Sequence, residues 1–228
     1  MLPIPSITVQ TALALAGASM SVLLAIRTTP GAEQKISWFS RVLLILTGTA
    51  WPLLLSTLTE ELSLIVWSGY TVLGYLWLYG STVDIASYRI PNSITFGSFG
   101  LLLLIRIIDG TLRNSLYSEV VFTTEGALVA AGSLWFIQKT YFLLRKKRGV
   151  GGGDIKLLLS LGGLVGVKGI LVMLFVSSVL GLFVAVCRVI TQQSEITRQT
   201  AIPFGPYLCV GAAITHLWGN VIFDYLFC

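Results

Sequence analysis

The chain has 228 residues, of which 55% are hydrophobic and 11% are charged, and its formal net charge is +5. Soluble domains contain about 25% charged residues, so this composition excludes an ordinary soluble protein. Nucleic-acid binding is not indicated either, because the basic residues lie mainly between long hydrophobic segments, as in membrane proteins. We therefore expect an all-α, polytopic helical membrane protein that contacts membrane lipids and no nucleic acid.

Hydrophobic runs recur along the chain, near the length of about 20 residues that a helix needs to cross a bilayer. They predict about eight transmembrane helices, at residues 7–26, 39–58, 62–83, 93–108, 124–144, 155–167, 168–190 and 203–223. The sixth and seventh form one continuous run, which we expect to turn between Gly166 and Gly169. No charged segment precedes the first run, so we interpret it as a span and not as a cleaved signal peptide.

Basic residues predict the orientation of these helices, because Lys and Arg concentrate in cytoplasmic loops. If the 145–153 loop is cytoplasmic, alternating spans place on that side Arg27, Lys35, Arg41, Arg89, Arg145, Lys146, Lys147, Arg148, Lys156, Arg188 and Arg198. The opposite side then holds Arg106, Arg113 and Lys168, and Lys139 falls within a span. This asymmetry favours the arrangement, which also brings Asp84 and Asp154 to the same membrane face.

The sequence does not indicate a metal or cofactor site. The three cysteines are widely spaced and form no CxxC pair, and His216 is the single histidine. We expect His216 to pack inside its hydrophobic span. The glycines of the sixth span, Gly162, Gly163 and Gly166, are expected to let that helix pack closely against a neighbour.

Two acidic residues lie in patterned junctions between spans. Asp84 begins the stretch DIASYRIPNSIT, in which Pro91 interrupts the helix and Asn92, together with Ser93, is expected to cap the next one. Asp154 directly follows Gly151, Gly152 and Gly153, and glycines allow a helix or an extended peptide to pass close to the carboxylate. Other acidic residues are expected in loops or at span ends, where water solvates them; they include Asp109 and Glu119.

Two carboxyl groups that face each other at a semi-buried site cannot both ionise cheaply, so one keeps its proton. The pair can then act as an acid and a base around one water molecule and hydrolyse an amide bond. Simpler interpretations remain open, since an aspartate at a membrane boundary often caps a helix or pairs with a basic residue. Lys156 is expected to reach the membrane interface, where it could bias the charge of Asp154.

Three segments together resemble the type IV prepilin peptidases, which are membrane aspartic proteases of the GxGD class. The segments are VDIASYRIPNSIT (83–95), GVGGGDIKLLLSLGGLVG (149–166) and IPFGPYL (202–208), and they occur in the family's order. The resemblance covers roughly residues 62–223. It implies a six-helix catalytic core, here at 62–228. The two N-terminal spans at 1–61, which the hydrophobic runs predict, have no clear counterpart in the resemblance and could be scaffold.

The resemblance also implies an activity and a site. Such enzymes cleave the basic leader from prepilins or pseudopilins at the cytoplasmic face of the cell inner membrane. Asp84 and Asp154 would be the catalytic pair, with the roles of acid and base left open because coupled carboxyls titrate as a unit. The substrate cleft would involve Gly151, Gly152, Gly153, Lys156, Arg89, Pro91, Asn92, Pro203, Gly205 and Pro206.

The chain departs from the bifunctional members of this family in one respect. Those members carry a zinc-binding cytoplasmic domain with paired CxxC motifs near the N-terminus, linked to methylation of the new N-terminus. Here the corresponding loop, 27–38, is short and lacks a CxxC motif. We therefore expect a monofunctional peptidase.

Two alternative functions remain open, and the sequence does not indicate an oligomeric state. One is another GxGD protease, of the preflagellin peptidase type, which shares the fold and the motifs. The other is a proton-coupled transporter subunit, in which intramembrane acids would relay ions. Transporters often carry internal repeats with matching broken helices, and we find no second GxGD-like element in the sequence.

Overall fold

The computed structural model describes residues 7–29, 38–58, 63–146, 151–190 and 203–227. These residues form helices and no strand, so the prediction of an all-α chain is confirmed. The helices are α1 (Ile7–Thr28), α3 (Trp38–Leu58), α4 (Leu64–Ser87), α5 (Asn92–Leu112), α6 (Leu116–Arg145), α7 (Gly152–Ile190) and α8 (Gly205–Phe227). Several residues used to predict the orientation lie outside the described residues, namely Lys35, Lys147, Arg148 and Arg198.

Three helices are long and apolar enough to cross a membrane: α5, α6 and the Gly152–Cys187 part of α7. Shorter apolar helices occupy Leu13–Thr28 and Leu44–Leu55. Large hydrophobic side chains on the outside of α6 are exposed, including Leu128, Phe136 and Leu144. Exposed apolar side chains along a whole helix are typical of a surface that faces lipid. The structure thus supports a helical membrane protein, while the number of eight crossings stays a prediction.

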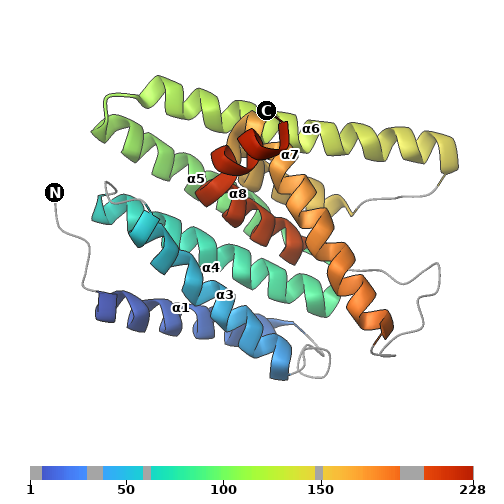
Figure 1. The fold of residues 1–228 in the computed structure, drawn as a ribbon, viewed down its shortest axis with the longest axis horizontal. Coiled ribbons are helices and arrows are strands. Elements are labelled where there is room, and N and C mark those ends of the chain that lie inside the picture. Colours follow the sequence, from blue (N-terminus) through green and yellow to red (C-terminus); the bar gives the residue numbers. More distant parts are fainter. Residues whose placement is uncertain (1–6, 30–37, 59–62, 147–150, 191–202, 228) are drawn as a thin grey trace.

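Helix α4 lies in the middle of the bundle and packs against α1, α3, α5 and α8 (Figure 1). Helices α1 and α3 lie at one edge and α6 at the opposite edge, whereas α7 packs against α5, α6 and α8 (Figure 1). The C-terminal ends of α1, α4 and α6 point to the same side of the bundle (Figure 1). This arrangement agrees with the alternating orientation that the basic residues predict.

Helix α7 bends at Gly166, whose backbone has φ 69° and ψ 175° and is therefore not helical. The bend divides α7 into two arms, 152–165 and 167–190. A Cβ atom added at Gly169 would lie 2.8 Å from Cβ of Val165, so the bend is tight. It lies in the stretch where the sequence predicts a turn, and glycine suits it because a positive φ strains other residues.

The first arm of α7 packs closely on α6, as its glycines lead us to expect. A Cβ atom added at Gly162 would lie 2.6 Å from the carbonyl oxygen of Gly126 and would collide with Ala130. Small residues at a crossing let two helix backbones approach and gain dispersion contacts. On its other side, the arm is joined to α4 by a hydrogen bond of 3.2 Å from Trp77 Nε1 to Ser160 Oγ.

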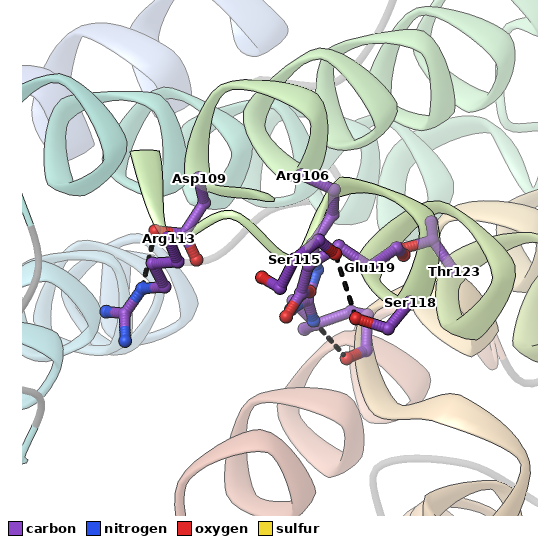
Figure 2. Close-up of polar contacts among 8 residues, drawn as sticks. Arg106, Asp109, Arg113, Ser115, Ser118, Glu119 and Thr123 are labelled. Carbon is purple, nitrogen blue, oxygen red and sulfur yellow. Dashed lines mark hydrogen bonds and ion pairs between the residues drawn. The ribbon is translucent and has the colours of Figure 1, made fainter. Parts of the chain in front are cut away.

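Two sequence-based expectations about the ends of α5 and α6 are wrong. Helix α6 begins at Leu116, eight residues before the predicted span at 124, because Ser118 and Glu119 do not interrupt the helix in its first turn. Asp109 and Glu119 are not simply solvated by water: Asp109 is 8% exposed and pairs with Arg113, and Glu119 pairs with Arg106 (Figure 2). Local hydropathy marks such residues as loop residues, whereas ion pairing allows them to be partly buried.

Candidate active site

Asp84 lies in the last turn of α4 and is 6% exposed. The helix ends because Tyr88 adopts a left-handed conformation, with φ 55°, and its N–H donates to the Asp84 carbonyl at 2.8 Å. The chain then passes through Arg89 and Ile90 to Pro91, the N-cap of α5. A proline there cannot continue the preceding helix. The carboxyl group of Asp84 is thereby held at the junction of α4 and α5.

The first residue of α8 contacts the Asp84 carboxylate directly. The Gly205 N–H donates to Asp84 Oδ2 at 3.1 Å, and the bond is buried. A Cβ atom added at Gly205 would lie 2.8 Å from the same oxygen, so only glycine leaves room for this contact. The N–H groups in the first turn of a helix lack partners within the helix, and a carboxylate satisfies one of them favourably.

Asp154 lies in the first turn of α7 and is half-buried. The backbone N–H of Gly151 forms a hydrogen bond with its carboxylate, and the Asp84 carboxylate interacts with it electrostatically. Cys209, on α8, lies within electrostatic range of both carboxylates. The structure therefore brings the two aspartates, seventy positions apart in the sequence, within electrostatic range of each other.

Ile90 lies between the starts of α7 and α8 and is 8% exposed. A Cβ atom added at Gly153 would lie 3.4 Å from Ile90 Cβ, and one added at Gly205 would lie 3.1 Å from Ile90 Cδ1. Both glycines thus allow a helix start to approach the segment after Asp84. All three segments that carry the family resemblance meet around this one side chain.

Lys156 and Asn92 form a second link between α7 and α5. Lys156 Nζ donates to Asn92 Oδ1 at 2.8 Å and lies 5.9 Å from the centre of the Phe96 ring. The expectation that Asn92 caps α5 is wrong, because Pro91 is the N-cap residue and no side chain caps that end. The Asn92 side chain instead fixes the basic residue that follows Asp154 by two positions.

The remaining residues of the predicted cleft lie around this junction. Arg89, Pro91 and Asn92 line an open cavity of about 430 Å³, which Thr28 and Thr29 at the end of α1 border on the other side. Pro206 lines a separate, mainly apolar cavity of about 90 Å³ between α3, α4 and α8.

Gly152, in contrast, lines neither of these two cavities. It has open space around it and lines a groove with Trp135, Lys139 and Phe142 of α6. Pro203, just before α8, is buried. The predicted cleft residues therefore do not all line one cavity.

Ser81 and Cys209, which line the apolar cavity of Pro206, are not among the site residues predicted from the sequence. Ser81 precedes Asp84 by three residues and Cys209 follows Gly205 by four, so each pair shares one helix face. That spacing is a signal that could have identified both residues. No spacing in the sequence indicates that Thr28 and Thr29 border the cavity lined by Arg89, because this contact depends on how α1 packs on α4.

Residues 71–186, just over half of the chain, match the model of the Type IV leader peptidase family. Among curated relatives, the "Prepilin leader peptidase/N-methyltransferase" of Xanthomonas campestris pv. campestris is 32% identical over 160 residues, 69% of this chain and 53% of the relative. The protein of the same name from Legionella pneumophila is 32% identical over 179 residues, 74% of this chain and 59% of the relative.

The chain spans about half the length of the curated relatives that it matches. No solved structure is significantly similar to it. The match to the family model includes Asp84, the segment up to Asn92 and the glycine-flanked Asp154, which are the residues that meet in the structure. On this basis the chain belongs to the type IV leader peptidase family.

Proposed function

We propose that the chain is a membrane aspartic endopeptidase that removes the leader peptide from type IV prepilins or pseudopilins, using Asp84 and Asp154. The observation that supports this most strongly is the convergence of Asp84, Asp154 and the Gly205 N–H at the ends of three helices. The family match and the names of the relatives support the choice of substrate. The active site would face the cytoplasm at the inner membrane, as the basic residues predict.

The two carboxyl groups would share one water molecule. The ionised carboxylate takes a proton from the water, whose oxygen attacks the scissile carbonyl carbon, while the protonated carboxyl donates its proton to the carbonyl oxygen. The tetrahedral intermediate then collapses and its C–N bond breaks. The leaving nitrogen takes the proton that the first carboxyl received from water, and a hydroxyl of the intermediate returns its proton to the second carboxylate, so one carboxyl is again protonated and the other ionised. The Gly205 N–H would hold Asp84 in place throughout this cycle.

Two spaces near the starts of α5 and α7 could receive a peptide. The groove of Gly152, Trp135 and Phe142 opens between α6 and the start of α7, toward the apolar outer surface of α6. The hydrophobic helix of a substrate would approach from lipid along this groove. The cavity of Arg89 and Asn92 would then receive the segment on the other side of the scissile bond.

Incubation of the purified chain with a prepilin, a pseudopilin and a preflagellin tests this proposal. Mass spectrometry of the products reports the position of the cut and any added methyl group. We expect cleavage between the leader and the hydrophobic segment of the prepilin or pseudopilin. Cleavage of the preflagellin alone would assign the chain to the preflagellin type, and an absence of cleavage of all three would refute a leader peptidase.

A further inference from the structure

At the opposite end of the first arm of α7 from Asp154, Arg106 of α5 connects three helices. Its Nη1 forms an ion pair of 2.8 Å with Glu119 Oε2 of α6 (Figure 2). Its Nη2 donates to the Leu164 carbonyl of α7 at 3.1 Å. The side chain of Arg106 is 11% exposed and that of Glu119 is 25% exposed. A largely buried guanidinium requires close partners, and here a carboxylate and a backbone carbonyl contact its two terminal nitrogens.

The contact with Leu164 compensates for the bend in α7. The last carbonyls before a break in a helix lose the N–H partners that they would have one turn further on. Leu164 lies two residues before Gly166, where the backbone leaves the helical conformation. A guanidinium at that position satisfies the carbonyl and complements the negative end of the helix dipole.

Aromatic rings and a cavity lie beside the contact between Arg106 and Leu164 at the bend of α7. The Arg106 guanidinium lies 5.4 Å from the centre of the Phe122 ring and 6.0 Å from that of Tyr70, within the range of cation–π attraction. A Cβ atom added at Gly166 would collide with the Phe122 ring. Beside the bend, an open cavity of about 490 Å³ is lined by Arg106, Glu119 and Leu164, so packing does not support the bend from that side.

We propose that Arg106 is a positioning residue for Asp154, acting through the first arm of α7. Asp154 and Leu164 lie on the same helical arm, about 15 Å apart at 1.5 Å per residue. A change in the angle at the bend therefore moves the Asp154 carboxylate relative to Asp84 on α4. The Arg106–Glu119–Leu164 contacts hold the end of that arm, at the bend, against α5 and α6.

The proposal rests on the proposed function for its kinetic test, while a second measurement is independent of catalysis. We expect Arg106→Gln to lower kcat for leader removal by on the order of 10- to 100-fold, with KM changed less than about threefold, because small displacements of reacting groups reduce rates strongly. Arg106→Lys keeps the positive charge but cannot bind Glu119 and the Leu164 carbonyl with two separate nitrogens, so its kcat is expected to lie between those of Arg106→Gln and the parent. Arg113→Gln, which removes the more exposed cation of the Asp109 pair on the same helix, is the matched control with unchanged kcat.

Spin labels at Gly152 and Val72, both exposed, report the position of the arm relative to α4. Double electron–electron resonance should give one narrow distance distribution in the parent and in Arg113→Gln, and a shifted or broader one in Arg106→Gln.

A distribution and a kcat for Arg106→Gln equal to those of the parent would overturn the proposal. A lower yield of folded protein with unchanged kcat per folded molecule would show a purely structural role. If the parent cleaves no prepilin, the proposed function fails, and the distance measurement still decides the role of Arg106.

Discussion

The backbone N–H of Gly205 donates a hydrogen bond of 3.1 Å to the carboxylate of Asp84, although 121 positions separate the two residues. This bond joins the start of α8 to the end of α4. The start of α7, with Asp154, lies against the same segment through Gly153 and Ile90. Gly153 and Gly205 therefore allow the starts of α7 and α8 to approach the end of α4, so that the three helix ends meet at Asp84 and Asp154.

Substitution of Gly205 by alanine should disrupt this junction. The added Cβ would lie 2.8 Å from Asp84 Oδ2, so the carboxylate must move or α8 must withdraw. We expect leader removal to fall by at least about tenfold and the free energy of unfolding to fall by about 1–3 kcal/mol, as in other overpacked sites. Gly100→Ala in α5, where an added Cβ meets no atom within 4 Å, is the matched control. Rates and thermal unfolding midpoints in detergent measure both effects; equal values for the two variants would contradict the assignment.

Much of the fold follows from local sequence patterns. Hydrophobic runs predict the helices because each run must bury or face lipid along its whole length. The bend near Gly166 is predicted by a run too long for one crossing and by the glycines within it. The ion pair of Asp109 with Arg113 was not predicted, although a spacing of four residues indicates that two side chains can meet on one helix face.

The contacts of the site depend on packing between distant helices, and the sequence does not specify them. The resemblance identified Asp84, Asp154 and Gly205, but it did not predict that the Gly205 N–H binds Asp84. Asn92 has the sequence position of a helix cap, yet its side chain binds Lys156 on another helix. Such polar partners are chosen in three dimensions, where a helix cap competes with any donor that packing brings within reach.

The hydrogen bond between Lys156 and Asn92 should couple the two residues in function. We expect Lys156→Met and Asn92→Leu each to slow leader removal by a few-fold, and the double variant to be no slower than the worse single variant. The bond is exposed, so we expect little effect on the free energy of unfolding. A double-mutant cycle on kcat/KM measures the coupling. Additive effects would indicate that the two side chains act independently.

The close crossing of α6 and α7 should tolerate no added methyl group. Gly126→Ala would place its Cβ against the carbonyl of Gly162, whereas a Cβ at Gly132, on the same helix, meets no atom within 4 Å. We expect Gly126→Ala to lower the free energy of unfolding by about 1–3 kcal/mol. Gly132→Ala should be neutral or raise it by up to about 1 kcal/mol, because alanine favours the helix. Reversible unfolding in mixed micelles measures both values, and equal stability of the two variants would contradict the described crossing.

The central claim is that Asp84 and Asp154 act together on one bond, and isosteric substitution of each tests it most directly. Asp84→Asn and Asp154→Asn keep side-chain volume but remove the acid–base function, so we expect each to lower kcat for prepilin cleavage by about 10²–10⁴-fold. The double variant should be about as slow as either single one, since residues that act as a unit are not additive. Asp109→Asn, which alters a comparably buried acid outside the site, should keep the parent rate. Prepilin cleavage at the parent rate by a folded Asp84→Asn or Asp154→Asn variant would contradict the account.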